Sequence, residues 1–172
     1  MKNRILVAGI GNIFLGDDAF GVEAVGWLKE RPLPEGVRIV DFGIRSYDLA
    51  FALTEGYDAV ILVDAVPRGG PPGTTYLMEL DAGDLSELKP ETIDGHSLNP
   101  VSVLQLAQAL GGAIGKLFLV GCEPAVLETE DGPLKLSPAV QAAIPQALTM
   151  IEELISELLG SKQKTNADPV PA

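Results

Sequence analysis

The sequence predicts an α/β protein, a three-layer α/β/α sandwich around a five-stranded, mostly parallel mixed sheet with one antiparallel strand. Short apolar runs rich in β-branched residues alternate with segments whose apolar residues recur at helical spacing, which is typical of this class. Hydrophobic residues make up 47% of the 172-residue chain, enough to fill one core. We therefore expect a single domain over residues 1–160, followed by a disordered polar tail over residues 161–172.

Each expected strand is a short apolar run bounded by glycine, aspartate or a turn-forming stretch. The strands are expected over residues 5–8, 37–40, 59–63, 74–80 and 117–120. The third, Ala59–Val63, contains no polar residue and is typical of a strand buried on both faces. The stretch that follows it, Pro67–Gly73, is rich in glycine and proline and too short for a helical crossover, so we expect the fourth strand to be an antiparallel neighbour.

Each expected helix has apolar residues at intervals of three and four positions. The helices are expected over residues 20–28, 47–54, 100–110 and 137–159. Asp17 and Asp18 directly precede the first helix, where carboxylates cap a helix and complement its dipole. Gly160 is expected to end the last helix.

The composition excludes several classes of partner. The formal net charge of −12 argues against nucleic acid and anionic membrane surfaces, both of which bind through Lys and Arg. No apolar run approaches the roughly 18 residues of a membrane-spanning helix, and the first one is interrupted by Gly9 and Gly11, unlike a signal peptide. The single cysteine, Cys122, cannot form an internal disulfide and fits a reducing compartment. We expect a cytoplasmic protein without nucleic-acid or membrane partners.

Four residues are candidates for a site because of their positions relative to the strands. Sites in open α/β sheets form outside the carboxyl ends of the strands. Asp18 follows the first expected strand, Asp41 the second and Asp64 the third, and His96 lies in the loop before the third helix. Asp18 and Asp64 have a simpler interpretation, because an aspartate there can cap a helix or turn. A histidine in a polar loop is usually an ordinary surface residue.

Considered together, these residues favour a metal site. Asp18, Asp64 and His96 offer two carboxylates and one imidazole, a mixed ligand set that suits a divalent transition metal and leaves positions open for water or substrate. A serine triad is less plausible, because His96 is the only histidine and no G-x-S-x-G motif is present. A cysteine nucleophile is also disfavoured, since Cys122 follows a buried run and is expected to be a small core residue.

A dinucleotide site is the alternative suggested by the pair Gly9 and Gly11. Phe14 replaces the third glycine of that fingerprint, and Asp17 and Asp18 would place negative charge where a pyrophosphate needs positive potential. We therefore expect no nucleotide cofactor. The glycines fit a tight turn that lets the helix and the sheet pack closely.

Four segments, in order along the chain, resemble the nickel–iron hydrogenase maturation endopeptidases. The segments are Ile5–Val22, Val63-Asp64-Ala65 with Pro72-Gly73-Thr74, His96 with Leu98, and Val120-Gly121-Cys122-Glu123-Pro124 with Leu136-Ser137-Pro138. The similarity covers residues 4–159 at natural spacing. Four collinear segments are far more specific than any one of them.

The resemblance implies a function, a substrate and a set of site residues. Members of this family remove a short C-terminal extension from a hydrogenase large-subunit precursor after nickel insertion, so the nickel is supplied by the substrate. Carried over by motif, the residues that contact the metal are Asp18, Asp64 and His96. Asp41 is expected to orient the peptide or to act as a base. Arg45 is either a contact for the substrate's terminal carboxylate or a solvated loop charge.

The sequence departs from the family pattern in three places. Asp18 stands where the family commonly has glutamate, which leaves Asp17 as an alternative ligand. The usual Asp-Gly-Gly after the second strand is Asp41-Phe42-Gly43 here, and Asn99-Pro100 replaces a common glycine after the histidine. The last two changes bear on which hydrogenase is processed. A nickel-dependent checkpoint or chaperone that holds the precursor without cutting it would use the same ligands and is the alternative function.

Overall fold

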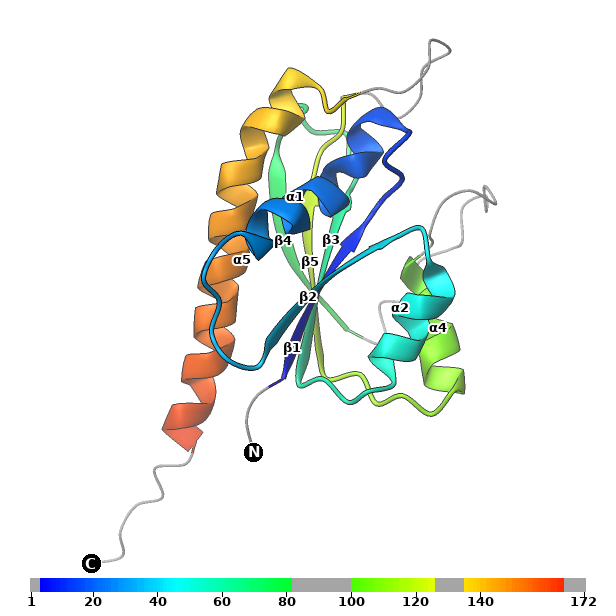
Figure 1. Cartoon of the computed structure of the whole chain (residues 1–172), viewed down its shortest axis with the longest axis vertical. Helices are drawn as coiled ribbons and strands as arrows, with labels where there is room; N and C mark the ends of the chain where they lie inside the picture. Colours follow the sequence, from blue (N-terminus) through cyan, green and yellow to red (C-terminus); the bar gives the residue numbers. More distant parts are fainter. Residues whose placement is uncertain (1–3, 82–99, 126–134, 166–172) are drawn as a thin grey trace, which may run out of the picture.

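The computed structural model describes residues 4–81, 100–125 and 135–165 and shows a five-stranded sheet between two layers of helices (Figure 1). The strands are β1 (Ile5–Ile10), β2 (Val37–Gly43), β3 (Ala59–Ala65), β4 (Thr75–Leu80) and β5 (Lys116–Cys122). Their order in the sheet is β2-β1-β3-β5-β4. The predicted α/β sandwich with a mixed sheet is confirmed.

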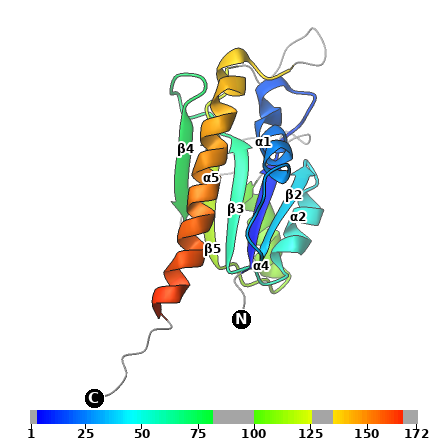
Figure 2. The same ribbon diagram turned by 60° about the vertical axis from the view of Figure 1, so that its left-hand side comes forward.

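Helices cover both faces of this sheet. They are η1, a short 3-10 helix (Gly16–Ala19), and the α-helices α1 (Phe20–Lys29), α2 (Ser46–Leu53), α4 (Pro100–Ala109) and α5 (Pro138–Thr165). Helices α1 and α5 lie on one face and α2 and α4 on the other (Figures 1 and 2). No helix within the described ranges is long and apolar enough to cross a membrane.

Each face of the sheet has its own hydrophobic core, because successive side chains of a strand point to opposite faces. In β1, Ile5 and Val7 pack in the core under α1 and α5, whereas Leu6 and Ala8 pack in the core under α2 and α4. All six residues of β1 are buried. The continuous apolar runs in the sequence therefore mark strands that are covered by helices on both sides.

The antiparallel strand is β4, as predicted, but its neighbour is β5 and not β3. Strand β5 lies between them, parallel to β3 and antiparallel to β4. The reason is burial: β5 is buried at most of its positions, whereas most positions of β4 are only half-buried, so β5 suits the interior of the sheet and β4 its edge. The pairing of β4 with β3, inferred from the short link between them, was wrong.

The last helix is longer than the sequence predicted. Helix α5 runs through Gly160 to Thr165, so the helix end expected at Gly160 is wrong. Gly160 has no positive φ and takes an ordinary helical conformation. A glycine inside a helix costs only about 1 kcal/mol relative to alanine, which is too little to end a long packed helix. Residues 166–172 of the predicted tail lie outside the described residues.

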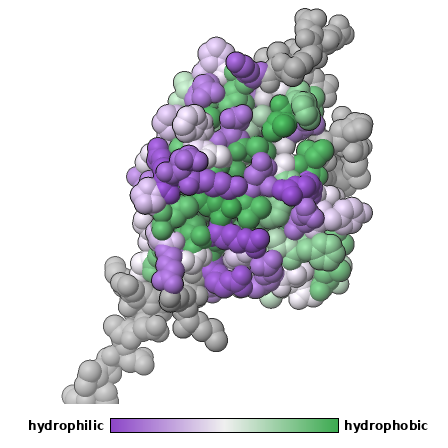
Figure 3. Space-filling view, in the orientation of Figure 1, coloured by the Kyte–Doolittle hydropathy of each residue, from purple (hydrophilic) through white to green (hydrophobic). Residues whose placement is uncertain are grey.

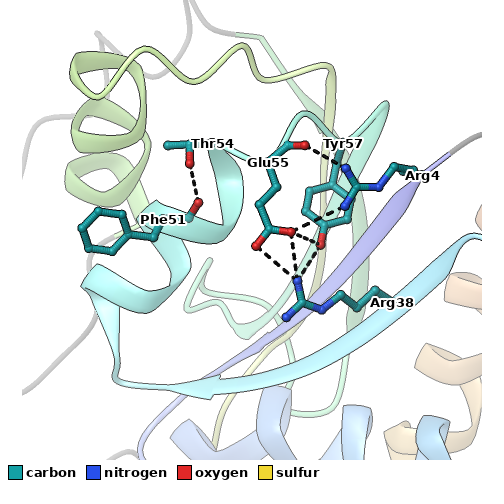
Figure 4. A network of polar contacts seen from close by, with 6 residues as sticks. All are labelled: Arg4, Arg38, Phe51, Thr54, Glu55 and Tyr57. Carbon is teal, nitrogen blue, oxygen red and sulfur yellow. Dashed lines mark hydrogen bonds and ion pairs between the residues drawn. The ribbon is translucent and has the colours of Figure 1, made fainter.

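A polar cluster joins the amino-terminal ends of β1, β2 and β3 (Figure 4). It lies opposite the carboxyl ends of these strands, near which Asp18, Asp41 and Asp64 are found. Arg4 and Arg38 form ion pairs with Glu55 at 3.5 and 3.2 Å, and Arg38 donates a hydrogen bond to the Tyr57 hydroxyl at 2.8 Å. The Arg4 guanidinium also stacks over the Tyr57 ring, 4.7 Å from its centre. Because exposed ion pairs contribute only about 0–1 kcal/mol each, we assign this cluster a modest structural role.

Candidate functional site

The candidate site lies where the connections of two adjacent parallel strands diverge. The chain leaves β1 towards β2 and leaves β3 towards β4, and these destinations lie on opposite sides of the β1–β3 pair. This divergence is the position at which open α/β sheets form their ligand sites. Asp18 follows β1 in η1, and Asp64 is the next-to-last residue of β3.

Glycines allow the start of α1 to sit directly on the ends of these two strands. A Cβ atom at Gly21 would lie 2.2 Å from the carbonyl oxygen of Ile10 and 2.0 Å from that of Val63. Gly11 has φ +144°, and a Cβ there would lie 1.8 Å from the carbonyl oxygen of Asp18. The turn that carries Asp18 is therefore held against the end of β3 by contacts that only glycine permits.

Substituting Gly21 by alanine is expected to lower the free energy of unfolding by roughly 2–3 kcal/mol, because the new methyl group would overlap two backbone carbonyls. The matched control is Gly26→Ala in the same helix, where a Cβ meets nothing within 4 Å. That change is expected to stabilise the protein by about 0.5–1 kcal/mol. Urea unfolding of both variants measures the two effects, and equal stabilities would contradict the close approach of α1 to the strands.

The structure brings the carboxylates of Asp18 and Asp64 together. Both side chains are half-buried. Burial raises the pKa of Asp18, although the Asn12 N–H, which donates to Asp18 Oδ2 at 2.8 Å, lowers it in part. Burial, and then the negative charge of Asp18, raises the pKa of Asp64 well above its usual range, against a smaller lowering by the Ala65 amide. A pair of neighbouring carboxylates with pKa values raised by burial, one of them further by the charge of the other, is typical of functional sites.

Asp17 has a different, structural role. Its side chain is fully buried and accepts hydrogen bonds from the Ala125 N–H (2.8 Å), the Ser137 N–H (2.7 Å) and the Ser137 hydroxyl (2.9 Å). It thereby joins the first family-like segment to the fourth. Neither η1 nor α1 has a side-chain hydrogen bond at its N-cap, so the prediction that Asp17 and Asp18 cap the helix is wrong.

Asp41 lies near the carboxyl end of β2, on the same side of the sheet as the ends of β1 and β3. The sequence had suggested that it follows the strand, but it lies inside β2. Its side chain is half-buried. The end of β2 is joined to the loop after β1 by a hydrogen bond from the Gly11 N–H to the Gly43 carbonyl, at 3.1 Å. Arg45 donates to the backbone carbonyls of Asp41 and Phe42, and so closes the turn between β2 and α2. A contact of Arg45 with substrate stays a prediction.

His96, the third predicted metal ligand, lies outside the described residues. Among the residues that the structure does describe, no group of three His, Cys, Asp or Glu side chains could hold a metal ion. The described part of the site contributes the Asp18 and Asp64 carboxylates. Their chemistry fits a divalent cation, because a positive charge would offset the burial that raises both pKa values and the charge of Asp18 that further raises the pKa of Asp64.

Glu123 is a buried carboxylate to which the sequence reasoning assigned no role. It is 5% exposed and accepts hydrogen bonds from the Arg68 N–H (2.8 Å), the Gly69 N–H (3.1 Å) and the Tyr76 hydroxyl (2.8 Å). These bonds, led by that of the Arg68 amide, lower its pKa. Glu123 thus fixes the loop that follows Asp64. The available signal was an acidic residue directly after a buried strand, the same signal that identified Asp64.

Cys122 is a core residue, as predicted. It is fully buried at the end of β5 in the core under α1 and α5. Burial, with smaller contributions from the charges of Asp17 and Glu123, raises the pKa of the Cys122 thiol to about 11. A nucleophilic cysteine needs a low pKa and access to substrate, so this residue is unsuited to catalysis.

The fold and the paired carboxylates define an α/β protein whose site lies at the carboxyl ends of β1 and β3. Residues 22–154 match the hydrogenase maturation protease family, and the chain belongs to it. The hydrogenase 2 maturation protease of Escherichia coli is 34% identical over 170 residues, which cover 98% of this chain and 96% of that protein. The hydrogenase expression/formation protein HupD of Rhodobacter capsulatus is 35% identical over 90% of this chain and 71% of that protein.

Solved structures agree with this assignment. The hydrogenase maturating endopeptidase HybD from E. coli superimposes with a TM-score of 0.77 at 34% identity, covering 90% of this chain and 93% of that one. A hydrogenase 2 maturation peptidase from Thaumarchaeota archaeon gives a TM-score of 0.65 at 33% identity, covering 89% of this chain and 98% of that one. The family resemblance and the protease class inferred from the sequence are confirmed, whereas the roles of individual site residues stay predictions.

Proposed function

We propose that this protein is a cytoplasmic endopeptidase that removes the C-terminal extension of a nickel–iron hydrogenase large-subunit precursor after nickel has been inserted. The supporting observation is the pair Asp18 and Asp64, two half-buried carboxylates with raised pKa values at the carboxyl ends of β1 and β3. In a hydrogenase maturation protease, this pair is the best candidate for recognising a cation that the precursor carries.

The nickel in this scheme belongs to the substrate and is not a resident cofactor. Asp18, Asp64 and His96 would contact the precursor's nickel, which would anchor the precursor and polarise the scissile carbonyl or activate a bound water. A precursor without nickel would bring no charge to offset the repulsion between the two carboxylates. Asp41, at the same edge of the sheet, would orient the peptide or accept a proton. Because the protein recognises the cation, cleavage would take place only after nickel has been inserted.

The test is to incubate the purified protein with nickel-loaded and with nickel-free precursor and to measure the intact mass of each. Only the nickel-loaded precursor is expected to lose the mass of its extension. An unchanged mass in a stable complex would instead support the alternative, a nickel-dependent checkpoint or chaperone that binds without hydrolysis. Equal cleavage of both precursors would contradict the role assigned to nickel.

A further inference from the structure

Exposed hydrophobic side chains gather on the two segments that lead out of β1 and β2. Ile13 and Phe14, 53% and 68% exposed, lie between β1 and η1. Ile44, 48% exposed, lies between β2 and α2, and Tyr47, 70% exposed, is in the first turn of α2. Figure 3 shows hydrophobic side chains over these loops, at the right of the view. We call Ile13, Phe14, Ile44 and Tyr47 the apolar rim.

The loops that carry the apolar rim are hydrogen-bonded to each other and to the candidate site. The loop after β1 and the end of β2 are joined by the hydrogen bond between Gly11 and Gly43. Asn12 links the rim to the carboxylates, because its N–H donates to Asp18 Oδ2 at 2.8 Å and its side-chain oxygen accepts from the Phe14 N–H at 2.9 Å. The backbone turn that displays Phe14 is thus held by the same residue that positions Asp18.

The rest of the described surface has no comparable cluster of large exposed hydrophobic side chains. Trp27 on α1, Leu77 on β4 and Leu110 after α4 lie on separate elements, while Phe51 extends the rim by one turn of α2. Scattered apolar residues are normal on a protein surface, whereas a contiguous group near a site marks contact with another molecule. Aromatic side chains such as Phe14 and Tyr47 are the usual anchors of such contacts.

We propose that the apolar rim docks the polypeptide that flanks the scissile bond of the precursor, with Phe14 and Tyr47 as its anchors. This inference rests on the proposed function. The occupant follows from continuity with the site: the segment after β1 carries both Asp18 and the Ile13–Phe14 part of the rim, and it is hydrogen-bonded to the end of β2, which leads to Ile44 and Tyr47. A polypeptide whose scissile bond lies at the carboxylates therefore passes beside the rim. The carboxylates suit a cation rather than a peptide, so the apolar contacts supply the affinity for the chain itself and hold the bond in place.

The experiment compares the double variant Phe14→Ser/Tyr47→Ser with wild type on nickel-loaded precursor. We expect KM to rise by about tenfold or more, because each exposed anchor loses its apolar contact, with kcat changed by less than about twofold. The control is Trp27→Ser, which removes an aromatic side chain that is 55% exposed near the far end of α1 and is expected to leave KM unchanged. Phe14→Leu combined with Tyr47→Phe keeps the apolar surface and should restore KM.

The outcomes separate the docking inference from the proposed function. Unchanged KM in the double variant, with wild type active, would overturn the inference and leave the proposed function intact. If wild type binds the precursor without cutting it, the proposed function fails, and the Kd of that complex tests the rim by the same comparison. A wild-type dimer in sedimentation that becomes monomeric in the double variant, with KM unchanged, would assign the rim to a second copy of this chain and overturn the proposal.

Discussion

Replacing Asp64 by asparagine is expected to reduce precursor processing by on the order of 10²-fold or more while leaving the protein at least as stable as wild type. The amide keeps the size of the side chain but removes the negative charge that would face the substrate's cation. In the wild type that charge is half-buried next to Asp18, which is why its pKa is raised well above the usual range. Removing it should increase the free energy of unfolding at neutral pH, because the folded state no longer holds a charge that burial and Asp18 disfavour.

The same pKa shifts predict how this difference in stability depends on pH. The carboxyl groups of Asp18 and Asp64 have higher pKa values in the folded state, so they favour folding below their unfolded-state values, near pH 4. That stabilisation is lost as pH rises through the folded-state pKa values. In urea unfolding with chelator present, the free energy of unfolding of Asp64→Asn should therefore rise relative to that of wild type from about pH 4 towards pH 7. A variant less stable than wild type at pH 7 would show that the carboxylate stabilises the fold.

Replacing Asp17 by alanine is expected to have the opposite signature, a large loss of stability. The substitution leaves the Ala125 N–H and both donors of Ser137 without the buried carboxylate that accepts from them. These are partly buried hydrogen bonds to a charged group, worth about 1–3 kcal/mol each and not additively, so we expect a loss of roughly 3 kcal/mol. For a protein of this size that corresponds to a Tm lower by roughly 6–12 °C, which calorimetry measures.

The neighbouring residue provides the control for that experiment. Asp18 is half-buried, and its contact with the Asn12 N–H is a single backbone hydrogen bond. We therefore expect Asp18→Ala to change Tm little and to abolish processing of nickel-loaded precursor. Normal processing by Asp18→Ala, together with a stable but inactive Asp17→Ala variant, would reverse the assignment and make Asp17 the ligand.

The sequence could not distinguish these two aspartates, and the structure shows why. Asp17 and Asp18 are consecutive in a 3-10 helix, where each residue is rotated by about 120° from the one before. One carboxylate therefore faces residues 125 and 137 and the other faces the end of β3. Spacing along the chain places both at the first helix start, but only the three-dimensional contacts decide which of them reaches the site.

Features determined by local composition were predictable, and features determined by contacts distant in sequence were not. The apolar flanks of Asp64 correctly indicated a carboxylate beside a buried strand, and Gly9 and Gly11 correctly indicated a close approach of helix and sheet. The insertion of β5 between β3 and β4, and the attachment of Glu123 to the loop after β3, depend on pairings between residues far apart in the sequence. The prediction that the last helix ends at Gly160 was wrong because the packing of α5 outweighs the weak helix preference of one glycine.

The convergence of Asp18, Asp64 and His96 on one metal ion is tested most directly by anomalous diffraction from crystals soaked in nickel or cadmium. We predict one ion in contact with both carboxylates and with the His96 imidazole, at the carboxyl ends of β1 and β3. An ion bound without Asp64, or the His96 ring directed away from the two carboxylates, would contradict this arrangement.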